Sequence, residues 1–386
     1  MNRLLLASVG LAGALGCVVP PLGVQLYSDD TPRRHAVYRL DWRAFVTPST
    51  ENGPIDLVVS RYAPFESSSP VVVLRQSGPK AEVVVGASDG SLKAFTLRGK
   101  LLWEFRGGGP MGSPIGDQGR ILVGCGDGLL YALSADDGSL LWSYASGEEL
   151  GSAPVVSNGL VFVLSSSDTL FALEAQTGKW AWRYRREASG HEFAIHSVTS
   201  PLVVGDLAIA GFSDGTVVAL RSKDGSVVWQ HVTSGGSELQ DSAGSPQSDG
   251  ERVFVANYKD GLTALAVQDG RALWQRALPT ASQLRLSRGT LFAAAVGKVA
   301  AFNAYDGTPL WEKGIGSSSA TGLLTFPGVL LVSMEGPMLF LNARTGRPLG
   351  RSFDPGKAGI TSAPGLHGRD LYVLSNNGWL YAMHLL

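Results

Sequence analysis

The stretch ADDGSLLW, from Ala135 to Trp142, decides the fold, because variants of it recur along the whole chain. A turn ending in glycine leads into a short apolar strand that ends on tryptophan. Related stretches end at Trp103, Trp182, Trp229, Trp274 and Trp311, and ARTGRPLG places Gly350 where tryptophan is expected. Asp-Gly and Thr-Gly turns of this kind join antiparallel strands into hairpins. The chain is therefore predicted to consist of repeated β-hairpins.

A second repeated marker is an alternating strand that ends in Ala-Leu or a close variant. It occurs eight times, at Ala94, Ala132, Ala172, Ala219, Ala264, Ala301, Phe340 and Ala382, so the intervals are 38, 40, 47, 45, 37, 39 and 42 residues. A period of this size, with several short strands and glycine turns in each unit, is typical of propeller blades. We predict an all-β fold, an eight-bladed β-propeller of four-stranded antiparallel blades.

The repeated tryptophans are interpreted as structural residues on the outermost strand of each blade. An indole ring there fills the wedge between two twisted sheets and removes roughly 150–250 Å² from water. The segment YRLDWRAF, residues 38–45, carries a tryptophan without a hairpin of its own. We expect this N-terminal strand to close the ring as the fourth strand of the last blade, which removes free sheet edges. The structural set is Trp42, Trp103, Trp142, Trp182, Trp229, Trp274 and Trp311.

The N-terminal segment has the pattern of an export signal. Arg3 precedes an apolar run from Leu4 to Leu15, which is too short for a stable membrane-spanning helix and suits a signal-peptide core. The run ends before Cys17 in a sequence that resembles a bacterial lipobox, so Cys17 is the predicted lipidation site. Ordinary signal cleavage, which leaves a free thiol there, is the alternative. The predicted division is a signal peptide at 1–16, a tether at 17–36 and the propeller at 37–386.

Composition and motifs do not indicate catalysis. The 386 residues carry a net charge of −1, which argues against a nucleic-acid partner. The Gly-rich segment 107–112 is followed by Pro114 and a β-run, not by the helix that a dinucleotide site requires. Cys125, the second of two cysteines, is interpreted as a small buried strand residue. The six histidines show no metal-ligand spacing. We predict no catalytic residue, no cofactor and no metal ligand.

The repeated unit, with its DG turn, Ala-Leu strand, second turn and tryptophan, resembles the pyrroloquinoline-quinone-type propeller repeat. Two classes of protein carry this repeat. Quinoprotein dehydrogenases are longer and commonly stack the quinone on a vicinal disulfide, and adjacent cysteines are absent here. The BamB-like lipoproteins of outer-membrane β-barrel assembly are similar to this chain from about Tyr38 to Leu386, and they share the missing tryptophan in the seventh unit. The resemblance also includes the lipobox-like segment that ends at Cys17.

The resemblance to BamB-like proteins implies a non-enzymatic scaffold, lipid-anchored at the periplasmic face of the outer membrane. Its implied partners are a BamA-like assembly protein and nascent outer-membrane β-barrel proteins. The implied contact loops are ASGHEFAIHSVTSP (188–201) and SGGSELQDSAGSP (234–246), which lie in the two longest units. By alignment with the family pattern, the expected partner-binding residues are Phe193, Ile195, His196 and Asp241.

Two departures from the family pattern fall in these loops. His196 stands where the family has arginine, and Ala243 replaces a second acidic residue. These departures weaken the expectation that the chain binds BamA in the same way. The alternatives are a quinone- or small-ligand-binding propeller, possibly a quinoprotein, and a lipoprotein propeller that serves another envelope complex.

Overall fold

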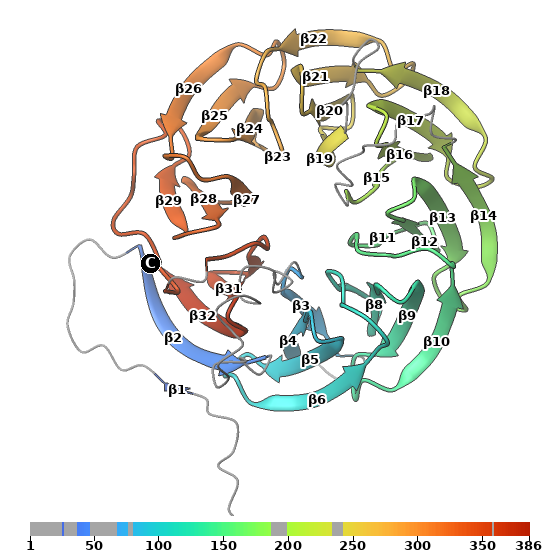
Figure 1. Cartoon of the computed structure of the whole chain (residues 1–386), viewed down its shortest axis with the longest axis vertical. Helices are drawn as coiled ribbons and strands as arrows, with labels where there is room; N and C mark the ends of the chain where they lie inside the picture. The colour runs from blue at the N-terminus through green and yellow to red at the C-terminus, as the bar shows by residue number, and fades with distance from the viewer. Residues whose placement is uncertain are drawn as a thin grey trace, which may run out of the picture.

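The chain forms a ring of eight β-sheets arranged radially around a central axis (Figure 1). This computed structural model describes residues 25–26, 37–46, 68–75, 80–186, 199–233, 242–356 and 359–386. Within these residues every regular element is a strand, and no helix with the length and hydropathy needed to cross a bilayer occurs. The predicted eight-bladed propeller is confirmed.

Each blade runs from a short strand near the axis to a strand at the rim. The first strands are β3 (Val71–Leu74), β7 (Ile115–Asp117), β11 (Val155–Ser157), β15 (Leu202–Val204), β19 (Ser242–Ser248), β23 (Gln283–Ser287), β27 (Ala320–Phe326) and β30 (Gly365–His367). The second strands are β4 (Ala81–Gly86), β8 (Arg120–Gly124), β12 (Leu160–Leu164), β16 (Leu207–Gly211), β20 (Arg252–Asn257), β24 (Thr290–Ala295), β28 (Val329–Met334) and β31 (Asp370–Leu374).

The outer half of each blade contains the two repeated sequence markers. The third strands are β5 (Ser91–Thr96), β9 (Leu129–Ser134), β13 (Thr169–Glu174), β17 (Thr216–Arg221), β21 (Gly261–Ala266), β25 (Lys298–Asn303), β29 (Leu339–Asn342) and β32 (Trp379–Leu385). The fourth strands are β6 (Leu101–Arg106), β10 (Leu140–Ala145), β14 (Trp180–Arg185), β18 (Val227–Val232), β22 (Ala272–Arg276), β26 (Pro309–Gly314) and β2 (Tyr38–Phe45). In the seventh blade, an isolated bridge between Leu341 and Pro348 takes the place of a fourth strand.

The ring closes between the two ends of the chain, as predicted. Strand β2 pairs antiparallel with β32, from Tyr38 opposite Leu385 to Phe45 opposite Trp379. A further short strand, β1 (Gln25–Leu26), pairs with the outer edge of β2, so the last sheet has five strands. Hydrogen bonds between β2 and β32 therefore join the first and last parts of the propeller without a covalent connection between them.

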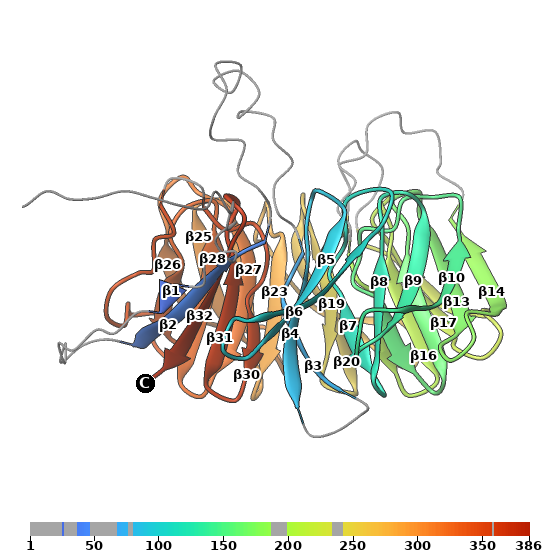
Figure 2. The same cartoon turned by 90° about the horizontal axis from the view of Figure 1, so that it is seen from below.

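The strands run between two faces of the ring (Figure 2). On one face, called here the crossover face, the fourth strand of each blade that has one leads into the first strand of the next blade. The opposite face, called the hairpin face, carries the turns between first and second strands and between third and fourth strands. The repeated Asp-Gly and Thr-Gly turns that precede the tryptophans lie on the hairpin face.

The hydrophobic core is divided into eight layers, one at each seam between neighbouring blades. Second and third strands are covered on both sides, so their apolar residues form continuous buried runs, as in LVFVL at 160–164. Small alanines such as Ala172 and Ala219 are fully buried where neighbouring sheets approach closely. The blades are therefore held together by side-chain packing, since the sheets share no backbone ladder.

Each repeated tryptophan packs on the turn glycine of the following blade. A β-carbon built on any of these glycines would lie 2.4–2.8 Å from the indole, and the glycines have φ between +68° and +84°. Glycine is required there for both reasons: close approach of the ring, and a left-handed backbone. The pairs are Trp42 with Gly99, Trp103 with Gly138, Trp142 with Gly178, Trp182 with Gly225, Trp229 with Gly270, Trp274 with Gly307, and Trp311 with Gly346.

Six of the seven indole N–H groups also donate a hydrogen bond to a backbone carbonyl of that next blade, at 2.7–3.4 Å. The exception is Trp142, whose N–H has no partner. The equivalent carbonyl, that of Ala175, accepts a hydrogen bond from Arg120 Nη1 at 2.9 Å. The structural role predicted for the tryptophans is confirmed, and the repeated turn and tryptophan are two halves of one contact between blades.

The seam between the seventh and eighth blades uses a different contact. Strands β32 and β2 are not joined by a hairpin, so the eighth blade offers no turn glycine on which a tryptophan at position 350 could pack. Tyr38 instead stacks on Phe340, with ring centroids 5.1 Å apart, and Phe353 lies edge-on to Tyr38 and Tyr381. The closure of the ring therefore explains why Gly350 breaks the repeat.

Candidate functional site

The two connections that contain the expected contact loops leave the crossover face from adjacent blades. One lies between β14, which ends at Arg185, and β15, which begins at Leu202; the other lies between β18, which ends at Val232, and β19, which begins at Ser242. Both lead into the first strands of neighbouring blades, the fourth and the fifth. The predicted contact residues Phe193, Ile195, His196 and Asp241 lie outside the described residues.

The described ends of these two connections are joined by a hydrogen bond. The backbone N–H of Ser200, just before β15, donates to Ser245 Oγ in β19 at 2.9 Å. This contact ties the start of the fourth blade to the start of the fifth. The two connections therefore re-enter the ring side by side, as expected for consecutive blades.

Buried polar groups hold the beginning of the second connection. Thr233, which directly follows β18, donates its hydroxyl to the carbonyl of Gly215 at 2.7 Å, and its Oγ1 accepts from Asn257 Nδ2 at 3.0 Å. Thr233 and Asn257 are both buried. A buried polar group that loses its hydrogen-bond partner lowers the stability of the fold, so these bonds hold the backbone in place where the chain leaves the ring.

Arg186 holds the beginning of the first connection against the fourth blade. Its Nε lies 2.7 Å from Asp214 Oδ2, and its two terminal nitrogens donate to Thr216 Oγ1 and Gln230 Oε1, each at 3.1 Å. Burial works to lower the pKa of Arg186, but the hydrogen bond and charge of Asp214 outweigh it, so the pKa is raised. The guanidinium thus acts as a fixed link between the third and fourth blades.

The groups around these exits are hydroxyls, two side-chain amides and a guanidinium paired with a carboxylate. None of the pairs described here sets a nucleophile against a general base. The arrangement holds two peptide segments next to each other on one face of the ring, which is suited to presenting a binding surface.

Cys125 directly follows β8 and is fully buried, as the sequence indicated. Its Sγ lies 3.1 Å from the carbonyl oxygen of Gly109, and burial raises the pKa of the thiol to about 11. A thiol with a raised pKa is a poor nucleophile, because the thiolate is the reactive form. The Gly-rich segment 107–112 runs from β6 to β7 without a helix, as expected for a connection between blades.

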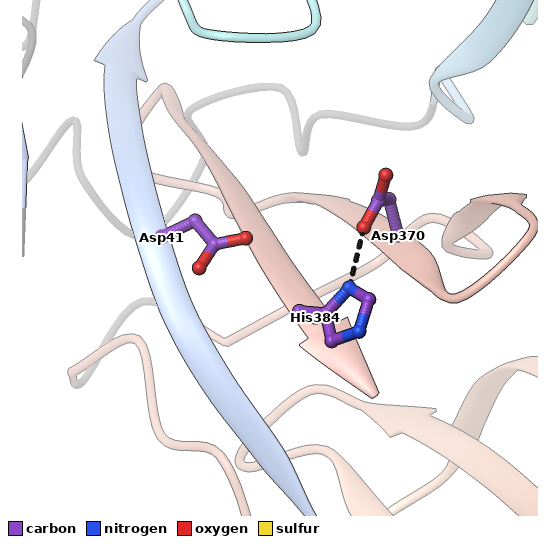
Figure 3. Close-up of side chains that lie close together, drawn as sticks. All are labelled: Asp41, Asp370 and His384. Atoms are coloured by element: carbon purple, nitrogen blue, oxygen red, sulfur yellow. Dashed lines mark hydrogen bonds and ion pairs between the residues drawn. The ribbon is translucent and has the colours of Figure 1, made fainter. Parts of the chain in front are cut away.

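Sequence reasoning missed one cluster of titratable groups, on the hairpin face of the closing blade. Asp41, Asp370 and His384 come from opposite ends of the chain, yet their ligand atoms lie within 4.8 Å of one another (Figure 3). The available signal was Asp41: it immediately precedes Trp42, a position that is apolar before each of the other six repeated tryptophans. Ring closure brings the other two residues to it.

Residues 88–313 and 260–385 match the family described as outer membrane protein assembly factor BamB. The chain belongs to the BamB family. A BamB of Burkholderia pseudomallei is 29% identical over 326 residues, which cover 82% of this chain and 83% of that protein.

Solved structures show the same fold as this BamB-family chain. The crystal structure of BamB from Moraxella catarrhalis superposes with a TM-score of 0.71 at 20% identity, covering 83% of this chain and 100% of that one. A quinoprotein ethanol dehydrogenase of Pseudomonas aeruginosa is 36% identical over 95 residues, which are 23% of this chain and 15% of the enzyme. In sequence, the BamB likeness extends over most of the chain, whereas the likeness to the dehydrogenase is confined to 23% of it; the fold of a quinohemoprotein alcohol dehydrogenase of Comamonas testosteroni nevertheless matches 83% of the chain with a TM-score of 0.66 at 14% identity.

Proposed function

We propose that this chain is a non-enzymatic scaffold of the outer-membrane β-barrel assembly machinery that binds a BamA-like protein. The observation that carries the proposal is the match to the BamB family over both halves of the propeller. In the proposed arrangement, a lipid on Cys17 anchors the chain to the periplasmic face of the outer membrane. Residues 17–36 then act as the tether between the anchor and the ring, with Gln25–Leu26 paired against β2.

The proposed contact with the partner is made by the connections from β14 to β15 and from β18 to β19 on the crossover face. Phe193 and Ile195 supply apolar contact area, while His196 and Asp241 supply polar contacts at the edge. The hydrogen bond from Ser200 to Ser245 supports this assignment, because it places the inner ends of both connections together. Two segments presented side by side form one surface larger than either could supply alone.

The outer strands support a role toward unfolded barrel strands. Their outward-facing side chains include exposed apolar residues, among them Leu140, Leu141 and Trp180, whose exposed fractions are 52%, 50% and 53%. An exposed strand edge can pair with an extended peptide, and flanking apolar side chains add affinity. We therefore include nascent outer-membrane β-barrel proteins among the proposed partners.

The contact with BamA is tested by co-purification from membranes. Ile195→Glu combined with Asp241→Lys is expected to lower the recovered BamA at least about tenfold, because a buried charge and a reversed charge each remove favourable contact energy. Glu251→Lys is the matched control: its side chain is exposed, and it lies at the opposite end of β19, on the hairpin face. Unchanged BamA recovery with the double variant would contradict the assigned surface. Recovery of a different envelope protein by the unaltered chain would favour the alternative scaffold role.

The quinoprotein alternative rests on the short match to the ethanol dehydrogenase. The residues present do not fit the quinone site that such enzymes commonly use, because the chain has no adjacent cysteines and Cys125 is buried against the carbonyl of Gly109. We expect pyrroloquinoline quinone with calcium to leave the melting temperature unchanged in differential scanning calorimetry. A rise of several degrees would support a ligand-binding propeller instead.

A further inference from the structure

The closing blade holds a mixed cluster of a histidine and two carboxylates on its hairpin face. His384 Nδ1 lies 2.8 Å from Asp370 Oδ1, and Figure 3 shows Asp41 projecting toward them from β2. His384 lies in β32, where it is opposite Asp370 of β31 on one side and Arg39 of β2 on the other. The cluster thus bridges the N-terminal strand and the two C-terminal strands that complete the ring.

A β-bulge places Asp41 in this group. The register between β2 and β32 shifts between Leu40 and Trp42, so Asp41 is the extra residue. A bulge redirects a side chain that would otherwise alternate to the other side of the sheet. The same shift occurs in the other four-stranded blades, where the extra residue is apolar: Leu102, Leu141, Ala181, Val228, Leu273 and Leu310.

The position of His384 also departs from the repeat. The equivalent residues at the ends of the other third strands are Thr96, Ser134, Glu174, Arg221, Ala266, Asn303 and Asn342. None of them is histidine, and none lies beside an aspartate at the bulge. The seven other blades fold without these side chains, so the repeat itself shows that the fold does not require them.

The charge of the cluster favours a divalent cation. Two carboxylates face one imidazole, and the nearest positive group is Arg39, whose Nε lies 2.8 Å from Asp41 Oδ1. The side chains of Asp41, Asp370 and His384 are 32%, 39% and 33% exposed, so an ion can reach them from solvent. Carboxylate oxygen with imidazole nitrogen is a ligand set that suits zinc and neighbouring transition ions, while calcium requires more oxygen ligands.

We propose that Asp41, Asp370 and His384 form a transition-metal site, with Zn²⁺ as the preferred probe, that fastens the N-terminal strand to the C-terminal strands. Tetrahedral coordination at about 2.0–2.2 Å requires ligand atoms roughly 3.3–3.6 Å apart. Side-chain rotation at this partly exposed site brings the three groups together, and water completes the coordination. The bound ion links β2 to β31 and β32 where no covalent connection exists. This inference is independent of the proposed binding of BamA, because the site lies on the opposite face.

Zinc titration of the metal-stripped full-length chain by isothermal calorimetry tests the site. We expect one zinc ion to bind with a Kd of about 10 µM or below, and the affinity to fall at least about tenfold in Asp41→Asn, Asp370→Asn and His384→Gln. Asp206→Asn, an exposed aspartate in the turn after β15 on the hairpin face of the fourth blade, is the matched control and should bind as the unaltered chain does. Arg39→Gln should bind more tightly, because it frees Asp41.

Hydrogen exchange of the amides in β2 tests the fastening role. Zinc should slow exchange across Tyr38–Phe45 about tenfold or more in the unaltered chain, because a ligand that binds the closed ring stabilises it, and should have no effect in His384→Gln. Melting curves without zinc show that each variant is folded. Equal zinc affinity in the unaltered chain and all three ligand variants, or zinc binding that leaves exchange in β2 unchanged, would overturn the proposal.

Discussion

Replacing Trp229 with alanine is expected to lower the free energy of unfolding by about 3–5 kcal/mol. The indole is 7% exposed, lies against Gly270 of the next blade and donates its N–H to the carbonyl of Val267 at 2.7 Å. Alanine leaves a cavity at the seam between the fourth and fifth blades, and it leaves a buried carbonyl without that partner. Both the cavity and the unpaired carbonyl lower the free energy of unfolding.

Denaturant unfolding followed by circular dichroism measures this loss. Trp180→Ala is the matched control, since Trp180 lies on the same kind of outer strand but is 53% exposed, and we expect a change within about 0.5 kcal/mol. Gly270→Ala should also destabilise the ring, because its β-carbon would lie 2.5 Å from the Trp229 ring and φ is +70°. A loss below about 1 kcal/mol for Trp229→Ala would show that the seam does not depend on the indole.

Replacing Glu82 with glutamine is expected to stabilise the protein at pH 8 by about 2–3 kcal/mol. Glu82 is fully buried in β4, and among the described residues the only hydrogen-bond donor that acts on its carboxylate is the Trp103 indole, whose N–H also donates to the carbonyl of Ala135 at 3.4 Å. Burial raises the pKa of Glu82 from 4.5 to about 7, although the positive charge of Arg75 opposes the shift. Glutamine removes the buried charge, and Arg75 retains its ion pair with Asp136.

The sign of the pH dependence follows from the raised pKa. Between pH 4.5 and pH 7 the folded protein keeps the Glu82 proton while the unfolded chain has lost it, so the contribution of Glu82 to stability falls as the pH rises through this window and is lowest above it. Glu82→Gln should therefore match the unaltered protein near pH 4.5 and exceed it at pH 8. Melting temperatures across this range measure the difference, with the exposed Glu251→Gln as control. A difference in melting temperature that does not change with pH would contradict the raised pKa of Glu82.

The repeated markers predicted the architecture correctly because each blade must solve the same local problem. A tight turn needs glycine, the strand after it needs alternating side chains, and the seam needs a large ring, so all three recur wherever a blade packs on its neighbour. The N-terminal strand was also predicted correctly, since Trp42 had the marker without the hairpin. Every tryptophan in the predicted structural set lies at a seam between blades.

The contacts between blades were less accessible to prediction. The pairing of each tryptophan with the glycine of the following turn, the missing acceptor for Trp142, and the aromatic contacts of Tyr38 with Phe340 all join different repeats. The histidines showed no metal-ligand spacing along the sequence. Asp41 lies far from Asp370 and His384 in the sequence, and the three come together only when the ring closes. The expected partner residues Phe193, Ile195, His196 and Asp241 stay predictions.

The sequence by itself determined the number of blades, the position of their strands and the closure by residues 38–45. These features depend on turns and alternating patterns that act over a few neighbouring residues and then repeat. Only the tertiary structure decided which groups from distant parts of the chain share an environment, such as the buried Glu82 beside Arg75 or the hydrogen bond from Ser200 to Ser245. Burial and proximity between blades arise when the ring closes, and no local pattern records them.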